Sequence, residues 1–314
     1  MDFFIFTLAM ATLIFGADFI VHQSEAIAIR FKIPEFIIGS TLIALGTSLP
    51  EMAASVAASF NDKPQIAIAN AIGSNIINIT LVLGLIFIIA KPFKSNRDFF
   101  AKDSIWALLP ILTFLIMSID GKIGTFDAVL LLILMVAYLL FLVEDSKNGL
   151  IIEEIDEEIK NRFSWIKSII LLLIGFLFVV IGAHFAVDSA SNIAHSFGVS
   201  EWVISVVLIS FGTSLPELVV SISAALKGKV EMAIGNIIGS NLANTTMVIG
   251  MAALVKELPI SWSTTYFDLS VMTAATIMLI YITANKLYSR PAGIALMILL
   301  ALFLQDKIPA TIVT

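Results

Sequence analysis

The sequence of 314 residues contains no cysteine and little charge. The lack of cysteine excludes disulfides and thiolate metal sites. Only 13% of the residues are charged and 59% are apolar, with a mean hydropathy of +1.02, whereas a soluble domain has roughly a quarter of its residues charged. So much apolar surface must face lipid. This composition excludes soluble enzymes, nucleic-acid binders and secreted disulfide scaffolds, and predicts an integral membrane protein.

Apolar segments long enough to span a bilayer recur along the chain, since a spanning helix needs roughly 20 residues. Ten are predicted, at residues 3–21, 36–59, 66–90, 103–119, 125–143, 165–187, 201–226, 231–255, 266–285 and 291–307. The one sizeable polar connection, residues 144–164, contains the acidic run from Glu153 to Glu158 and is interpreted as a solvated linker. The fold class is therefore an all-α membrane protein with ten transmembrane helices.

The basic residues indicate the orientation of these helices. Of the 18 Lys and Arg residues, only Lys63, Lys122, Lys256 and Lys307 lie in even-numbered connections or tails, which leaves 14 (18 − 4) in the odd-numbered connections. Basic residues favour the cytoplasmic side of a membrane. We therefore expect both termini outside the cell, the linker 144–164 in the cytoplasm, and a location in the cell (inner) membrane.

An internal repeat divides the chain at a constant offset of 166 residues. Residues 35–84 and 201–250 align without a gap, and 24 of the 50 positions are identical. The first repeat spans 1–143 with its motif at 39–84, and the second spans 165–314 with its motif at 205–250. Five helices in each repeat force the second copy to enter the membrane upside down, as in many secondary transporters. Duplication without a transport role is the alternative.

The longest identical run, Gly-Thr-Ser-Leu-Pro-Glu, occupies residues 46–51 and 212–217 near the middle of the second and seventh predicted helices. Proline removes a backbone donor, and glycine lets the chain leave helical angles, so both helices should break here. Freed carbonyls at this depth are tolerated only against protein or a wet cavity. They are hard ligands for a cation, and the residues placed to offer them are Ala44, Thr47, Ser210 and Thr213.

Glu51 and Glu217 add a carboxylate to each break. A charge at the centre of a spanning helix costs about 2.5 kcal/mol or more, and every Lys and Arg falls at the end of a predicted span or in a connection. A bound cation is the expected partner, and a protonated pair that packs the helices together is the alternative. Further neutral oxygens come from a second matched stretch, in which two residues four apart share a helix face. These are Ser74 with Asn78 and Ser240 with Asn244.

This set of ligands favours calcium, which takes 6–8 oxygens, or the similar-sized sodium, over magnesium, which keeps its waters. A transition metal would need His or Cys. At these motifs the chain resembles the cation/calcium exchanger superfamily, most closely its prokaryotic sodium/calcium exchanger branch. The resemblance covers essentially the whole chain. It implies an antiporter with alternating access, driven by the sodium gradient, in which the first and sixth helices slide against the others.

Carried over by position, the resemblance makes Glu51 and Glu217 the carboxylates shared by calcium and sodium, with Asn78 and Asn244 at the middle position. Its remaining ligands are Thr47, Thr213, Ser48, Ser74, Ser214, Ser240 and the carbonyls of Ala44 and Ser210. Some relatives have alanine at Ser210, and potassium-dependent exchangers have aspartate at Asn244. The asparagine argues against potassium co-transport.

The leading hypothesis is a sodium-driven calcium antiporter that extrudes calcium, electrogenic and potassium-independent. A calcium/proton antiporter that uses the same glutamates is its rival, because buried glutamates also bind protons. A passive channel and an intramembrane hydrolase are less compatible with the inverted repeat and the absent nucleophile. We expect no enzymatic activity, no cofactor, and only lipid, Ca2+ and Na+ as partners. Each chain carries both halves of the predicted site and could act as a monomer.

Overall fold

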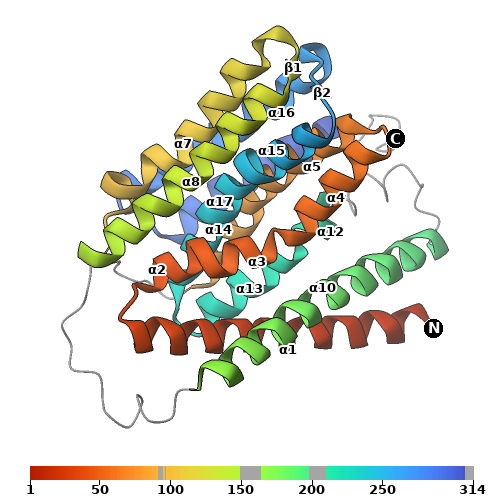
Figure 1. The fold of residues 1–314 in the computed structure, drawn as a ribbon. Helices are drawn as coiled ribbons and strands as arrows, with labels where there is room; N and C mark the ends of the chain where they lie inside the picture. Colours follow the sequence, from red (N-terminus) through yellow and green to blue (C-terminus); the bar gives the residue numbers. More distant parts are fainter. Residues whose placement is uncertain (91–94, 96, 149–163, 198–209, 308–314) are drawn as a thin grey trace. The chain divides into compact units, whose positions relative to one another are not determined.

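The computed structural model describes residues 1–90, 95, 97–148, 164–197 and 210–307, with only the backbone at Asn148 and Ser210, and these residues are almost entirely helical (Figure 1). They form two compact units. Unit 1 comprises Met1–Thr47 and Leu139–Gly239, and unit 2 comprises Ser48–Tyr138 and Ser240–Thr314. The division passes between Thr47 and Ser48, inside the first predicted cation motif. Each unit is described by itself.

Unit 1 is built on two long helices that run side by side (Figure 1). Its elements are α1 (Asp2–Phe31), α2 (Glu35–Ile38), the π-helix η1 (Gly39–Ile43), α3 (Ala44–Thr47), the end of α8 (Thr125–Asn148), α10 (Trp165–Ser196), α12 (Ser210–Thr213), α13 (Leu215–Leu226) and most of α14 (Val230–Ala243). A Cβ on Gly16 would lie 2.7 Å from the Gly175 carbonyl oxygen, so the glycines let α1 and α10 touch backbone to backbone.

Helices α1 and α10 are longer than predicted, since the expected spans ended at residues 21 and 187. The prediction stopped at polar residues that the structure keeps inside the helix. The buried face of α1 continues through Ser24, Ile27 and Ala28, and α1 ends where Lys32 takes a left-handed conformation (φ 56°). Polar side chains therefore did not mark the helix ends; the backbone at Lys32 did.

Unit 2 holds the remaining helices around one apolar core. Its elements are α4 (Leu49–Phe60), α5 (Pro64–Ile77), the π-helix η2 (Asn78–Leu83), α6 (Gly84–Ile89), α7 (Phe99–Met117), the 3-10 helix η3 (Ser118–Asp120), β1 (Lys122–Ile123), the start of α8, the end of α14, the π-helix η5 (Asn244–Val248), α15 (Ile249–Val255), β2 (Leu258–Pro259), α16 (Trp262–Ala284) and α17 (Arg290–Lys307). The core joins α5, α7, α15, α16 and α17.

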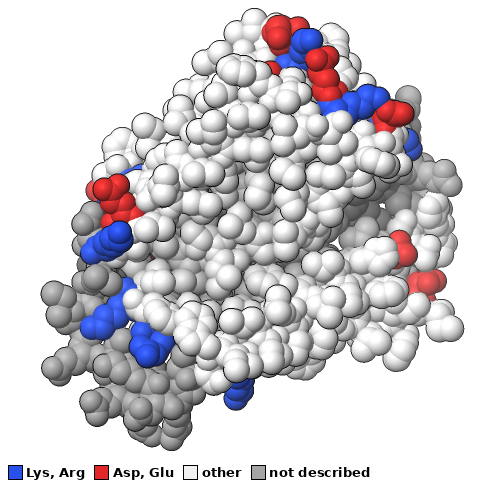
Figure 2. Space-filling model, viewed as in Figure 1, with Lys and Arg blue, Asp and Glu red and all other residues white. Residues whose placement is uncertain are grey.

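The outer surface of unit 2 has the apolar stripe that lipid requires. On α7 the side chains of Ile105, Leu109, Leu112 and Ile116 are exposed at helical spacing. On the face drawn in Figure 2, charged side chains gather over helix ends, as at the end of α7 beside β1, and the long side of α7 carries none. Exposed apolar faces between charged ends are typical of a helix that crosses a bilayer.

Connections that were predicted to share a side of the membrane contact each other. In unit 2, β1 pairs antiparallel with β2, with Lys122 opposite Pro259, and Lys256 forms an ion pair with Asp62. All these residues belong to even-numbered connections. In unit 1, the odd-numbered connections meet, because the rings of Phe31 and Trp165 lie 4.8 Å apart. Both observations agree with a chain that crosses the membrane alternately.

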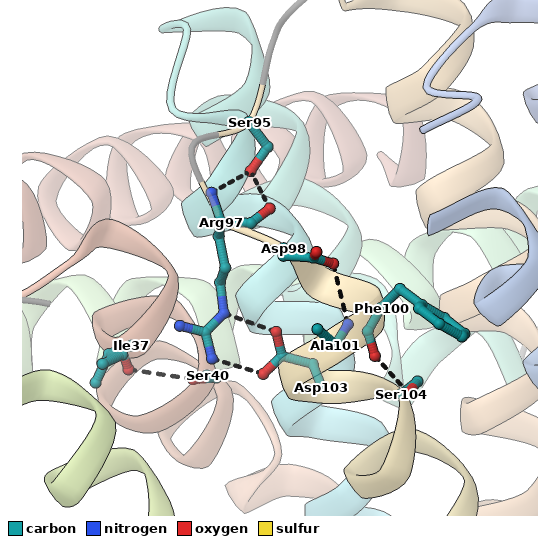
Figure 3. Close-up of polar contacts among 9 residues, drawn as sticks. All are labelled: Ile37, Ser40, Ser95, Arg97, Asp98, Phe100, Ala101, Asp103 and Ser104. Carbon is teal, nitrogen blue, oxygen red and sulfur yellow. Dashed lines mark hydrogen bonds and ion pairs between the residues drawn. The ribbon is translucent and has the colours of Figure 1, made fainter. Parts of the chain in front are cut away.

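A buried ion pair fixes the start of α7 (Figure 3). The Arg97 guanidinium donates through Nε and Nη2 to the two carboxylate oxygens of Asp103, at 2.6 and 2.7 Å, and their side chains are 7% and 1% exposed. Asp98 caps the helix by accepting from the Ala101 N–H at 3.0 Å. The bidentate geometry offsets the cost of burying two charges.

Seven helices among the described residues are long and apolar enough to span a membrane, and the bent pair α2–α3 with α4 makes an eighth. The predicted tenth span corresponds to α17, which is helical over 18 residues. It is not among the seven, since three of its residues are charged. Of the seventh, α12 and α13 are described, while 201–209 and the linker residues 149–163 lie outside the described part of the chain. The helical membrane fold is confirmed, and the count of ten stays a prediction.

The repeat reappears in the helix bounds. Helices α3, α4 and α5 begin and end 166 residues before α12, α13 and α14, and the π-helices η2 and η5 begin 166 residues apart. Two copies of one sequence motif therefore fold into the same local succession of helices. Pseudo-equivalent residues can consequently be compared pair by pair.

Candidate cation-binding site

The predicted helix breaks are present in both copies. Ser48 and Ser214 leave helical geometry with almost the same backbone angles, φ −85°, ψ 2° and φ −84°, ψ 1°. Pro50 and Pro216 occupy the second position of the helix that follows, where a missing N–H has no intrahelical partner to lose.

The glutamates lie directly after the breaks. Glu51 and Glu217 are each in the first turn of the helix that follows, α4 or α13. The positive end of a helix stabilises a carboxylate by about 0.3–1 kcal/mol, and up to about 2 kcal/mol when partly buried. The break therefore offsets part of the cost of placing a fully buried carboxylate at each position.

In unit 1 the predicted ligands of α3 lie next to the helix that carries Glu217, because α3 packs against α13. The Thr47 hydroxyl lies 3.3 Å from the Ala44 carbonyl oxygen and 3.3 Å from Oδ1 of Asn236. A hydroxyl has a single proton, so one of these contacts is weak at any moment. Two predicted ligands, the Ala44 carbonyl and the Thr47 hydroxyl, are thus brought together.

The second-repeat residues of unit 1 are less uniform. Ser214 is buried, and its hydroxyl makes no hydrogen bond within the described residues. Thr213 is half-buried, unlike its fully buried mate Thr47. The backbone of Ser210 begins α12, which suits the expected carbonyl ligand.

Six predicted ligands lie in unit 2, and all are buried. They are Ser48, Glu51, Ser74, Asn78, Ser240 and Asn244. Their elements contact one another, since α4 packs against both α5 and η5, and α5 packs against η5. Both polar atoms of the Asn244 amide are without a hydrogen bond among the described residues, as is Oδ1 of Asn78. A buried amide oxygen without a donor is available to a cation.

The π-helices were not predicted. Asn78 begins η2, and Asn244 begins η5, while Ala44 directly follows η1. A π-helical turn is rare and often marks a functional position. The polar residues of these segments were considered only as possible ion ligands, and no pattern in the sequence marks the π-helical turn itself.

Four further residues form hydrogen bonds near the breaks, and the sequence analysis assigned them no role. Asn70 donates through Nδ2 to the Ser55 hydroxyl at 3.0 Å and to the Glu51 carbonyl at 3.3 Å. Their repeat mates behave alike, with Asn236 donating to the Ser221 hydroxyl at 2.9 Å. The signal was available, because Ser55/Ser221 and Asn70/Asn236 are identical in the two copies.

These residues define the chemistry of the candidate ligands. They offer carboxylate, amide, hydroxyl and carbonyl oxygens, and the described residues contain no group of three His, Cys, Asp or Glu side chains that could hold a metal ion. Oxygen ligands with little charge suit Ca2+ or Na+ and not a transition metal. Fold and predicted ligands together describe a helical membrane protein with buried carboxylate, amide and hydroxyl groups at and around its helix breaks.

Comparison with known proteins places the chain within a family. The model of the sodium/calcium exchanger protein family matches residues 1–144 and 167–305. The chain belongs to this family. It is 31% identical to sodium/calcium exchanger MaX1 of Methanosarcina acetivorans over 96% of this chain and 97% of that protein. It is 33% identical to inner membrane protein YrbG of Escherichia coli K12, covering 84% and 83%.

A solved structure agrees with this assignment. The sodium-calcium exchanger NCX_Mj, soaked with Na+ and Sr2+, has a TM-score of 0.83 and 36% sequence identity, and the match covers 97% of each chain. The resemblance that the motifs indicated is confirmed. The protein is a membrane exchanger and not an enzyme.

Proposed function

We propose that this protein exchanges sodium for calcium across the cell membrane by alternating access. The observation that carries the proposal is the duplicated break, in which a buried glutamate begins a helix directly after the Ser48 or Ser214 kink. Membership of the sodium/calcium exchanger family supports it. The proposed architecture is ten helices in two inverted repeats. The equal helix bounds at an offset of 166 and the odd number of predicted spans in each repeat support it.

In this proposal the transported ions bind to the predicted oxygen ligands. Glu51 and Glu217 supply the charge that calcium and sodium share. The neutral ligands are Ala44, Thr47, Ser48, Ser74, Asn78, Ser210, Thr213, Ser214, Ser240 and Asn244. Asn244 in place of an aspartate leaves two carboxylates in this set, which favours an exchanger that is independent of potassium. Coupling to a sodium gradient across a polarised membrane would make the exchange electrogenic and direct it toward calcium extrusion.

Sliding of α1 and α10 is the proposed motion. Ion pairs tie α1 to the connection between α13 and α14, because Lys227 pairs with Asp18 and Lys229 pairs with Glu25 at 2.5 Å. Lys229 also pairs with Glu35 of α2 at 2.8 Å. A slide of α1 would change the partners of Asp18 and Glu25, while the ion pair between Lys229 and Glu35 of α2 remains. The charge of Lys229 would therefore stay paired before and after the slide. The predicted orientation places this cluster on the cytoplasmic side of the inner membrane.

The test removes one charge at a time from the proposed ligands. Glu51→Gln and Glu217→Gln should each abolish sodium-driven calcium uptake into proteoliposomes, because the amide keeps the shape and loses the carboxylate. Ser59→Ala is the control for α4, since Ser59 is buried two turns beyond Glu51 and is not among the proposed ligands. Transport retained in either glutamine variant, with normal thermal stability, would contradict the assignment.

A further inference from the structure

The two middle-position asparagines are pseudo-equivalent, but they are held differently. Asn78 and Asn244 lie 166 residues apart, and both are fully buried. Nδ2 of Asn78 donates to Oδ1 of Asn241 at 3.0 Å. Within the described residues, Asn244 makes no side-chain hydrogen bond at either polar atom. The repeat symmetry is therefore broken at the ligands themselves.

Hydrogen bonding determines which way the Asn78 amide faces. Nδ2 of Asn241 donates to the backbone carbonyl of Asn75 at 3.1 Å. A carbonyl only accepts, so the nitrogen of Asn241 must face it and the oxygen must face Asn78. Asn78 then presents its nitrogen to Asn241, which leaves its own Oδ1 as the acceptor without a donor. Each assignment follows from the previous one.

The mirror arrangement would have Asn244 donate to Oδ1 of Asn75, the repeat mate of Asn241. Asn75 instead donates to the Thr245 hydroxyl at 2.7 Å. The Thr245 hydroxyl donates its single proton to the Asn241 carbonyl oxygen at 3.0 Å. The hydroxyl must therefore accept from Asn75, which fixes the nitrogen of Asn75 toward Thr245. The repeat mate of Thr245 is Ile79, which has no hydroxyl, so this bond has no counterpart in the first repeat.

We propose that Asn241 is a positioning residue that holds Asn78 with its amide oxygen available to the transported cation, and that Thr245 prevents Asn75 from doing the same for Asn244. This inference rests on the proposed function. Asn78 is a preorganised ligand and binds without a cost of orientation. Asn244 is an adaptable ligand, whose amide orients only when an ion or a neighbouring group arrives.

The test compares the apparent KM for calcium with Vmax in sodium-loaded proteoliposomes. Asn241→Leu removes the acceptor for Asn78 and should raise the KM about fivefold, the effect of roughly one hydrogen bond. Thr245→Val keeps the shape and removes the hydroxyl that holds Asn75, whose Nδ2 keeps only its weaker 3.7 Å contact with Sδ of Met272 among the described residues. Asn75 can then turn toward Asn244, so the variant should lower the KM two- to fivefold, on the order of the same single bond. Thr246→Val is the matched control, because within the described part of the chain this buried hydroxyl bonds only the Leu242 carbonyl. A merely structural role would lower Vmax and leave KM unchanged.

A second variant separates orientation from general damage. In the Asn78→Asp background both side-chain atoms are oxygens, so no orientation is needed and Asn241→Leu should no longer raise the KM. An equal rise in both backgrounds would overturn the role of Asn241. If Asn241→Leu does not fold, Thr245→Val decides, since a KM equal to or above that of Thr246→Val overturns the proposal.

Different results would overturn the proposed function and the role of Asn241. Wild-type protein that shows no sodium-driven calcium uptake would overturn the proposed function and this inference with it. Normal wild-type exchange combined with the same KM in Asn241→Leu and Thr246→Val would overturn the inference alone.

Discussion

Gly39→Ala should separate two helices of unit 1 and disrupt the Thr47 contact. A Cβ on Gly39 would lie 2.2 Å from the Met232 carbonyl oxygen on α14. Ordinary contact begins near 3.4 Å, so the backbones must part by about 1.2 Å (3.4 − 2.2). Overpacking of this kind costs about 1–3 kcal/mol. The Thr47–Asn236 contact, already 3.3 Å long, joins the same chain segment to α14 and would be lost.

The assay combines thermal unfolding in detergent with sodium-driven calcium uptake. We expect a lower melting temperature and a higher KM for calcium in Gly39→Ala. Gly84→Ala is the matched control, because the added Cβ would lie 3.3 Å from the Gly293 carbonyl and from Met297, which need yield only slightly. A Gly39→Ala protein with the stability and KM of the control would refute the reasoning from this helix contact.

Three further predictions concern charged and polar groups. Arg97→Leu removes the bidentate partner of the buried Asp103 carboxylate and should lower the free energy of unfolding by about 3–5 kcal/mol, with recovery in the Arg97→Leu/Asp103→Leu double variant; chemical unfolding measures both. Asn244→Asp adds a carboxylate to the ligands and should alter the ion dependence, admitting potassium, and a variant indifferent to potassium, sodium and calcium concentrations would remove Asn244 from the ligands. Burial lowers the pKa of Lys229, but hydrogen bonds to Glu25 and Glu35 outweigh it and raise the pKa above its ordinary value. Stabilisation by a raised pKa is complete below the ordinary value and is lost only as pH rises through the folded one, so the effect of Lys229→Gln on exchange rate should be the same at pH 7 and pH 9; an effect that fades by pH 9 would contradict the pairing.

The sequence was sufficient to predict the helix breaks because their cause is local. Proline and glycine change the backbone at their own positions, so the runs at 46–51 and 212–217 predict a kink from the local sequence alone. The repeat could be read for the same reason, since identical residues at an offset of 166 fold into helices with identical bounds.

Other features depend on contacts that no local pattern encodes. The π-helices that begin at Asn78 and Asn244 correspond to no pattern that the sequence analysis could use. The orientation of the Asn78 amide depends on Asn241, 163 residues away. Composition and hydrophobic periodicity give no information about a partner so distant in the sequence. The full lengths of α1 and α10 escaped prediction because polar residues on a packed helix look like a helix end.

Calcium uptake driven by an imposed gradient distinguishes sodium-driven from proton-driven exchange. Proteoliposomes loaded with sodium are diluted into sodium-free buffer with calcium, and a parallel set carries only a proton gradient. A sodium/calcium exchanger should show uptake that requires internal sodium and responds to membrane voltage. Uptake that follows the proton gradient and ignores sodium would contradict it, and would make the protein a calcium/proton antiporter that uses the same two glutamates.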